Sequence, residues 1–397
     1  MITSRLPQVG TTIFTVMSAL AARHDAVNLG QGFPDFDCDS ALVDAVTRAM
    51  QAGHNQYPPM AGWPGLRSAI SNKIASVYGH RYDPDTEITV TAGATQALFT
   101  AILALIHPGD EAIVIEPAYD SYAPAIFLAG GRPVFVQMEV QTRAQTQSPT
   151  ESGQRFTIPW DRVRAAVTTK TRLILVNSPH NPTGMTMRED DLRALEDIVT
   201  RHSLYVLSDE VYEHMVFDGQ RHESVSRYPV LAQRSVVVSS FGKTFHVTGW
   251  KVGYAAAPRA LSDEFRKVHQ FNAFTVNTPM QAAIAEYLDD PSPYLELPAF
   301  YQAKRDFFRD GLTRTRFKLL PADGTYFQVV DYSAVRDDLS ESEFCRWLTS
   351  EIRVAAIPLS AFQESQNASP RDARLIRFCF AKKEETLALA LERLAEI

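Results

Sequence analysis

The sequence predicts an α/β fold in which a large domain is built on a mostly parallel sheet and is followed by a smaller α+β domain. Helical and strand-like patterns alternate through the middle of the chain, as they do in parallel sheets wrapped by helices. A chain of 397 residues is also too long for one ordinary domain, because domains average roughly 150 residues. After about residue 277 the pattern changes to long amphipathic helices. We therefore expect an N-terminal segment over 1–45 that packs with the small domain, a large domain over 46–280 and a small domain over 281–397.

Five short apolar runs rich in β-branched residues predict strands of the large sheet. Each run is followed by a polar or glycine-rich turn and then by a helical pattern. Ligands of open α/β sheets bind outside the carboxyl ends of the strands, so the residues that follow each run are candidates for chemistry. The runs cover residues 87–91, 112–116, 173–177, 204–208 and 235–239.

The rest of the chain shows weaker patterns. A short strand pair is expected around 324–330, and a final strand over 376–380 precedes the closing helix. The first forty or so residues lack alternating strands and helices, and we expect them to pack onto the C-terminal part and reach into the active site. The polar stretch over 142–154 predicts a surface loop of the large domain.

The composition is that of an ordered globular protein, with 45% hydrophobic and 21% charged residues. The net charge of -7 argues against a nucleic-acid partner, and the apolar run over 97–106 is too short to span a membrane. The cysteines Cys38, Cys345 and Cys379 lie far apart and in no zinc-binding spacing. We therefore expect a cytoplasmic protein without a metal site.

Lys243 follows the last predicted strand of the large sheet, in the segment SVVVSSFGKTFHVTGWKVGY. A lysine becomes a nucleophile toward an aldehyde when burial or neighbouring positive charge lowers its pKa. An apolar wall and Lys251 would supply both effects. Most lysines are simply exposed, but the preceding strand, Ser240 and the later GWKVGY favour a reactive amine here.

Asp209 and Tyr212 follow a second strand, in LYVLSDEVYEHM, and Asn181 follows a third, in LILVNSPHNPTGM. A carboxylate at Asp209 would keep a pyridine-type cofactor protonated on its ring nitrogen, so that the ring can accept electrons. Tyr212 and Asn181 could both donate to the phenolic oxygen of such a ring. The ordinary alternatives are a helix N-cap for Asp209 and a plain Asn-Pro turn for Asn181.

The segment TVTAGATQALFTAIL predicts a strand, a small-residue turn and a helix start that suits phosphate. Gly93 would permit close approach of the anion, and side chains from elsewhere would complete the cradle. An ordinary tight turn is the alternative. The expected phosphate ligands are the backbone N–H groups of Ala94, Thr95 and Gln96 and the side chains of Ser240 and Lys251.

Arg377 lies in the late apolar run RLIRFCFAK. The planar fork of arginine suits two parallel hydrogen bonds to a carboxylate, which lysine cannot reproduce. We therefore expect Arg377 to bind a carboxylate, and the ordinary alternative is a surface charge. Arg374 precedes the apolar run and is expected to be structural.

The motifs NPTG, SDEVY, SFGKT, GWKVG and RFCF stand in one order and together resemble the fold-type I, class I/II pyridoxal-phosphate-dependent aminotransferases. The resemblance runs from residues 28–36 to the closing helix and is nearest to the methionine aminotransferase and kynurenine/glutamine aminotransferase branch. It implies a seven-stranded large-domain sheet and a pyridoxal 5'-phosphate cofactor held by Lys243 as a Schiff base. It also implies that Lys243 moves the substrate Cα proton, with Asp209 on the ring nitrogen and with Asn181 and Tyr212 at the phenolic oxygen.

The resemblance also assigns residues outside the strand ends. Tyr119 would stack on the cofactor ring, and the backbone of Gly32 would lie beside the α-carboxylate. Tyr57 matches a tyrosine that a homodimer partner lends to the phosphate, so the active sites would be shared. With Phe14 and Phe274, Tyr57 would also make an apolar substrate pocket.

The implied reaction moves an amino group from a neutral, sulfur-containing or aromatic L-amino acid to a 2-oxo acid, with methionine as the first candidate and glutamine, kynurenine, phenylalanine and tyrosine behind it. FNAFTVNTP has no arginine to pair with a distal carboxylate, which disfavours acidic substrates. The alternatives are a cysteine-S-conjugate β-lyase and a non-catalytic sensor of the cofactor or an amino acid. A nicotinamide dehydrogenase is disfavoured because the turn at Gly93 lacks the GxGxxG spacing.

Overall fold

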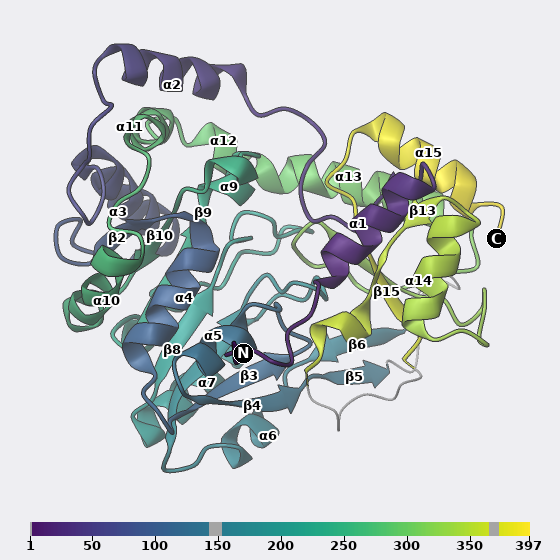
Figure 1. The fold of residues 1–397 in the computed structure, drawn as a ribbon, viewed down its shortest axis with the longest axis horizontal. Helices are drawn as coiled ribbons and strands as arrows, with labels where there is room; N and C mark the ends of the chain where they lie inside the picture. Colours follow the sequence, from purple (N-terminus) through teal and green to yellow (C-terminus); the bar gives the residue numbers. More distant parts are fainter. Residues whose placement is uncertain (1, 143–152, 365–372) are drawn as a thin grey trace.

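The computed structural model describes residues 2–142, 153–364 and 373–397, and its larger part is built on a seven-stranded sheet (Figure 1). The strand order is β2-β10-β9-β8-β7-β3-β4, and every strand is parallel to its neighbours except β10, which is antiparallel to both. The predicted mostly parallel sheet is therefore confirmed. The strands are β2 (Ile88–Thr91), β3 (Glu111–Glu116), β4 (Arg132–Gln137), β7 (Thr171–Asn177), β8 (Tyr205–Asp209), β9 (Ser235–Ser240) and β10 (Gly253–Ala256).

The five predicted runs coincide with β2, β3, β7, β8 and β9 to within two residues at each end. The runs missed β4 and β10. β4 is an edge strand with the sequence RPVFVQ, and only two of its six residues are buried. β10 is the four-residue segment GYAA, which has no β-branched residue to mark it as a strand.

Helices cover both faces of this sheet, and the alternation of side chains along β3 shows how (Figure 1). Ala112 and Val114 pack in one cluster with residues of α4, α5 and α10, whereas Ile113 and Ile115 pack on the other face with residues of α7. The helices of this part are α2 (Ser40–Gln51), α3 (Pro64–Tyr78), α4 (Gly93–Leu105), α5 (Tyr122–Leu128), α6 (Trp160–Ala165), α7 (Glu189–His202), α8 (Pro229–Ala232), α9 (Phe241–Thr244), α10 (Arg259–Asn272) and α11 (Thr278–Tyr287).

The sequence of α7 shows why such helices form. Leu192, Leu195 and Val199 recur at helical spacing and are fully buried, so one face of the helix packs on the sheet. The Asp191 side chain accepts from the backbone N–H of Arg188 at 2.8 Å, which caps the first turn. Three acidic residues in the first turn and two basic residues in the last also complement the helix dipole.

The smaller part contains an antiparallel sheet with the order β11-β12-β15-β14. The predicted final strand is confirmed as β15. The predicted pair around 324–330 contributes one strand, β12, which pairs with β11 and β15 instead of folding back within that stretch. The strands are β11 (Lys318–Leu319), β12 (Phe327–Asp331), β14 (Ile357–Pro358) and β15 (Leu375–Cys379), and the helices are α12 (Ser292–Leu295), α13 (Leu297–Leu312), α14 (Glu341–Ser350) and α15 (Glu384–Leu394).

The N-terminal segment contacts this smaller part. Helix α1 (Ile13–Arg23) contacts α14, and strand β1 (Val27–Asn28) pairs in parallel with β13 (Val354–Ala355) (Figure 1). The boundaries proposed near residues 45 and 280 fall inside α2 and α11, which contact each other, and the division into domains stays a prediction.

The polar stretch predicted as a loop lies between β5 (Glu139–Thr142) and β6 (Gln154–Thr157), which form a two-stranded antiparallel sheet. Residues 143–152 of that loop lie outside the described residues. Over the ranges that the structure describes, no helix is long and apolar enough to cross a membrane.

Candidate active site

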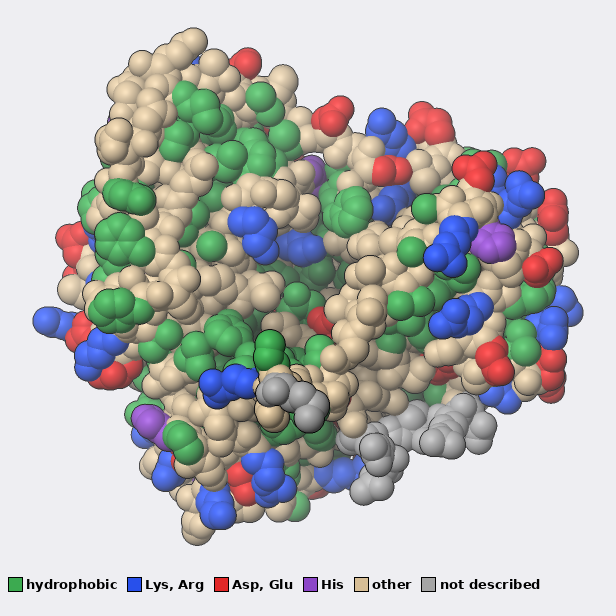
Figure 2. Space-filling model, viewed as in Figure 1, with side chains coloured by type: hydrophobic (Ala, Val, Ile, Leu, Met, Phe, Trp, Pro, Cys, Tyr) green, Lys and Arg blue, Asp and Glu red, His purple; other side chains and the backbone are tan. Residues whose placement is uncertain are grey.

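A cavity of about 250 Å³ lies where the large sheet, the smaller part and the N-terminal segment meet, and Figure 2 shows the molecule hollowed between its two parts. Asn177 and Asp209 reach it from the ends of β7 and β8, and Lys243 reaches it from the short helix α9 that follows β9. Its lining residues are Phe14, Gln31, Gly32, Ala94, Thr95, Leu98, Tyr119, Asn177, Asn181, Asp209, Val211, Tyr212, Lys243, Phe327 and Arg377.

Lys243 is held at the floor of this cavity by the short helix α9. Its Nζ donates to the carbonyl oxygen of Gly32 at 3.0 Å and to the hydroxyl oxygen of Tyr326 at 2.8 Å. Burial, together with the positive charges of Arg377 and Lys251, lowers the pKa of Lys243 to about 8. The amine therefore has the desolvated, electropositive setting that a nucleophilic lysine needs.

Asp209 is 4% exposed, and both of its carboxylate oxygens are held. The Tyr122 hydroxyl donates to Oδ2 at 2.7 Å, and the backbone N–H of Val211 donates to Oδ1 at 3.3 Å. Burial raises the pKa of Asp209 to about 6. The described residues after Asp209 form a turn and not a helix, so the N-cap alternative is wrong. A buried carboxylate of this kind favours a cationic partner.

Arg377 has the central position in β15, between β12 and β14, and is 1% exposed. Nη1 donates to Oδ1 of Asn181 at 2.6 Å, and Nη2 donates to the carbonyl oxygen of Gly30 at 3.1 Å. The guanidinium lies 3.9 Å from the ring centre of Phe327 and 4.8 Å from that of Phe362.

Burial lowers the pKa of Arg377 to about 10, so the side chain stays cationic at neutral pH. Its Nε is buried and has no partner within the described structure. An unpartnered buried donor on a buried cation suits an anionic ligand, and a carboxylate matches its planar geometry. Arg374 lies outside the cavity and donates to the backbone of Asp337.

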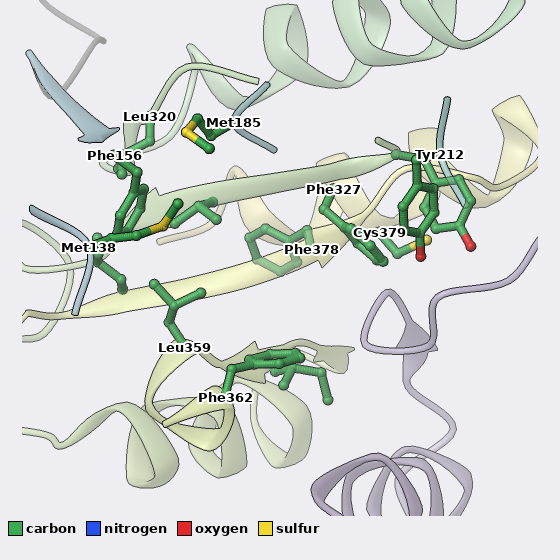
Figure 3. Close-up of a cluster of buried hydrophobic side chains, with 14 of the residues drawn as sticks. Met138, Phe156, Met185, Tyr212, Leu320, Phe327, Leu359, Phe362, Phe378 and Cys379 are labelled. Atoms are coloured by element: carbon green, nitrogen blue, oxygen red, sulfur yellow. The ribbon is translucent and has the colours of Figure 1, made fainter. Parts of the chain in front are cut away.

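Asn177 fixes the geometry of the NPTG turn relative to Asp209. Its Oδ1 accepts from the backbone N–H of Asn181 at 2.8 Å, and its Nδ2 donates to the carbonyl oxygen of Asp209 at 2.8 Å. Tyr212 is 3% exposed, and burial raises its pKa, so the phenol stays neutral. Figure 3 shows Tyr212 at the end of the buried cluster that also contains Phe327.

The predicted phosphate ligands gather at the start of α4. Gly93 has a φ of +75°, and a Cβ there would lie 3.3 Å from Nζ of Lys251. Ser240 pairs across the sheet with Gly253, and a Cβ at Gly253 would lie only 3.1 Å from the backbone nitrogen of Ala94. The N-cap residue of α4 is Ala92, whose side chain makes no hydrogen bond to the first N–H groups of the helix. The result is a basic cradle at a helix start.

Thr95 and Tyr119 both line the cavity, with their hydroxyl oxygens 3.3 Å apart. The Gln96 side chain instead donates to Thr100 and Asn272 in the direction of α10, so only its backbone is placed to serve an anion.

Tyr57 and Phe274 do not line the cavity of their own chain. Tyr57 is 81% exposed and Phe274 is 46% exposed, and their rings pack edge to face with centroids 5.5 Å apart. Phe14 does line the cavity, and its ring lies 5.6 Å from the guanidinium carbon of Arg377.

Several residues at the site carried no prediction. Asn177 could have been found, because it is a polar residue at the end of an apolar run, and Tyr122 follows the noted Tyr119 in EPAYDSY. Tyr326 precedes a buried strand of the smaller part and Phe327 begins it, and aromatic residues in such strands usually indicate only core packing. Gln31 is a polar residue in a segment without regular pattern.

The fold and the site together define a pyridoxal-phosphate-dependent enzyme of fold type I. The described residues fit the cofactor: a desolvated amine and a buried carboxylate lie in one cavity, and a helix start with a basic side chain lies at its edge. The unpartnered Nε of Arg377 leaves a donor free for the carboxylate of a substrate.

The family model described as aminotransferase class I and II matches residues 24–394. The chain belongs to this family, and it is therefore an aminotransferase that uses pyridoxal 5'-phosphate and acts on amino-acid and 2-oxo-acid substrates.

Curated relatives and solved structures agree with this assignment. The methionine aminotransferase of Escherichia coli strain K12 is 50% identical over 99% of this chain and 98% of its own length. Kynurenine--oxoglutarate transaminase 3 of Rattus norvegicus is 35% identical over 98% of this chain and 88% of its own. A solved Escherichia coli protein identified as a methionine aminotransferase superposes with a TM-score of 0.93 at 49% identity and covers 100% of both chains.

Proposed function

We propose that this aminotransferase takes its amino group from a neutral, sulfur-containing or aromatic L-amino acid, with methionine as the preferred donor. The observation that carries the proposal is the charge of the cavity: among its described lining residues, Lys243 and Arg377 are the only cations. With Lys243 committed to the cofactor, Arg377 can pair with one carboxylate. A substrate with a second carboxylate would leave that group buried without a partner, which costs several kcal/mol.

The surroundings of Arg377 are aromatic, and Phe14 and Phe327 also line the cavity. The rings of Phe14, Phe327 and Phe362 surround its guanidinium, at 5.6, 3.9 and 4.8 Å. An apolar side chain or a thioether gains from burial against such rings. The name of the 50% identical relative supports methionine, and the names of the kynurenine transaminases support aromatic donors.

When bound, pyridoxal phosphate supplies an aldehyde that joins to amines and a cationic ring that accepts electrons when the substrate loses its Cα proton. In our proposal Lys243 holds the cofactor and carries that proton, and Asp209 pairs with the ring nitrogen. Arg377 orients the α-carboxylate together with the backbone of Gly32. The remaining contacts are Tyr119 against the ring, Asn181 and Tyr212 at its phenolic oxygen, and Gly93, Ala94, Thr95, Gln96, Ser240 and Lys251 at the phosphate.

Borohydride reduction followed by peptide mapping tests the position of the cofactor. We expect the reduced pyridoxyl group on Lys243, and we expect Lys243→Ala to lose both this label and amino-group transfer. Lys267, an exposed lysine that pairs with Glu264 on α10, is the matched control, and Lys267→Ala should keep both. A label elsewhere, or full transfer by Lys243→Ala, would contradict the proposal.

A donor panel tests the substrate class. Methionine, phenylalanine, kynurenine, glutamine and aspartate should be compared by kcat/KM with one oxo acid in excess. We expect methionine to lead and aspartate to be slowest, because aspartate carries the unpaired second carboxylate. Initial-rate lines should run parallel when donor and acceptor are both varied, since one enzyme form carries the amino group between them. Aspartate in first place would refute the charge argument.

We further propose a homodimer with shared active sites, in which Tyr57 and Phe274 reach the cavity of the partner. The support is their exposure, 81% and 46%, together with their absence from the cavity of their own chain. Mixing Lys243→Ala with Tyr57→Phe protomers separates the possibilities. If Tyr57 acts in the partner, mixed dimers contain one fully intact site and activity returns. If it acts in its own chain, both sites stay damaged and the mixture stays inactive.

We also propose that the protein works in the cytoplasm, where thiols stay reduced. Cys38, Cys345 and Cys379 are all free, and two of them are buried. Fractionation of cells that express the protein tests this placement.

A further inference from the structure

The amine of Lys243 contacts two groups that come from distant parts of the chain. One is the carbonyl oxygen of Gly32 in the N-terminal segment, and the other is the hydroxyl of Tyr326, just before β12 in the smaller part. The two groups also contact each other, because the Tyr326 hydroxyl donates to the Gly32 carbonyl. Lys243, Gly32 and Tyr326 thus form a closed hydrogen-bonded triangle.

The triangle accepts two hydrogen bonds from the Lys243 amine and donates none to it. A neutral amine has two N–H donors and one lone pair, and both of its partners here are acceptors toward it, at 3.0 and 2.8 Å. These two bonds use both donors. The lone pair, which is the basic site, is left without a proton donor in this triangle.

Tyr326 is built to stay a neutral hydroxyl. It is fully buried, its pKa is raised well above the ordinary value by burial and by Tyr212, and its ring packs edge to face on Tyr212 with centroids 5.2 Å apart. A phenolate at this position would form an ion pair with the ammonium form of Lys243, raise its pKa and keep the amine protonated, so that its lone pair could not take a proton. A phenol instead holds the amine by hydrogen bonding alone.

We propose that Tyr326 is a further catalytic residue, whose hydroxyl, together with the Gly32 carbonyl, receives the amine of Lys243 whenever that amine is not joined to the cofactor. In this pose the amine keeps its lone pair available for the Cα proton of the substrate. This inference deepens the proposed function, because it rests on Lys243 as the proton carrier.

Tyr301 provides a matched control. It is fully buried like Tyr326, and the two ring centroids lie 5.6 Å apart. Its hydroxyl has no hydrogen-bond partner among the described residues. Tyr301→Phe and Tyr326→Phe therefore remove the same atom from neighbouring buried rings, and only the second touches Lys243.

The first experiment measures the free amine without any turnover. The cofactor-free protein is labelled with fluorodinitrobenzene, which reacts with uncharged amines, and the peptide that contains Lys243 is quantified against pH. The Tyr326 oxygen accepts more strongly from an ammonium than from an amine, so its removal should lower the labelling midpoint of Lys243, by about 0.5 to 1 pH unit. Tyr301→Phe should leave the midpoint at the wild-type value. An unchanged midpoint in Tyr326→Phe overturns the proposal.

The second experiment uses the cofactor-loaded protein with methionine and with α-deuterated methionine in single turnovers. We expect Tyr326→Phe to slow removal of the Cα proton by about tenfold or more, with a larger isotope effect and substrate affinity within about twofold of wild type. Proton removal at the wild-type rate overturns the proposal. Failure of the proposed function is a different result, since wild type and Tyr301→Phe would then show no amino-group transfer with methionine or any other amino acid.

Discussion

Replacement of Arg377 by lysine should weaken catalysis without removing the charge. The guanidinium is 1% exposed, donates to Asn181 and Gly30, and keeps Nε free for a ligand. Lysine at this position can offer a carboxylate one hydrogen bond where the planar fork offers two. A hydrogen bond to a charged group is worth about 1.5–3 kcal/mol. Because about 1.4 kcal/mol corresponds to a factor of ten, kcat/KM for methionine should fall about 10- to 150-fold.

The assay follows conversion of the bound cofactor by its absorbance and compares methionine with 3-(methylthio)propylamine, which lacks the carboxylate. The loss in Arg377→Lys should appear with methionine and nearly disappear with the amine, because only methionine uses the fork. Arg374→Lys is the matched control; Arg374 donates to the backbone of Asp337 outside the cavity, so kcat/KM should stay within about twofold. The reasoning is refuted if Arg377→Lys stays within about threefold of wild type on methionine, or if both substrates lose equally.

Three further changes test other parts of the molecule. Tyr122→Phe removes the bond that lowers the pKa of Asp209, so that pKa should rise above about 6 and the acid limb of kcat/KM should move to higher pH; an unmoved limb contradicts this. Glu213→Gln leaves Lys73 as an unpaired buried charge and should cost about 3–5 kcal/mol of stability in thermal melts. The pKa of Glu213 lies below its ordinary value of 4.5, so the stability difference between wild type and Glu213→Gln should be complete above pH 4.5 and should shrink below it. A stability difference that does not change with pH would contradict this ion pair. Gly253→Ala places a Cβ 2.6 Å from the carbonyl oxygen of Ser239, so the backbone beside the phosphate cradle must move. Pyridoxal phosphate should therefore bind more weakly in equilibrium titrations. Binding with wild-type affinity would contradict this expectation.

The sequence predicted those strands whose side chains are apolar on both faces. Runs such as 173–177 are buried from end to end, and the residues that follow them could be placed at one sheet edge from topology alone. It could not predict β4, whose edge position gives mixed exposure, or β10, whose small residues reflect close approach to α4. These two strands can be recognised only in the structure, from the strands that they pair with.

The same distinction applies to the site. Lys243, Asp209 and Asn181 could be placed because each follows a strand of one sheet, and the structure brings all three to one cavity. Tyr326 and the carbonyl of Gly32 could not, because their roles depend on how the smaller part and the N-terminal segment meet the large sheet. Contacts between segments that lie far apart in the sequence leave no periodic pattern in either segment.

The position of the N-terminal segment limits how far the chain can be shortened from its N-terminal end. The family match begins at residue 24, yet Phe14 lies in the cavity and α1 packs against α14. A chain trimmed to the matched region would lose Phe14 from the wall of the cavity while keeping the motifs NPTG, SDEVY, SFGKT, GWKVG and RFCF. Such a trimmed protein would pass a motif search and still have an incomplete cavity and an uncovered face on α14.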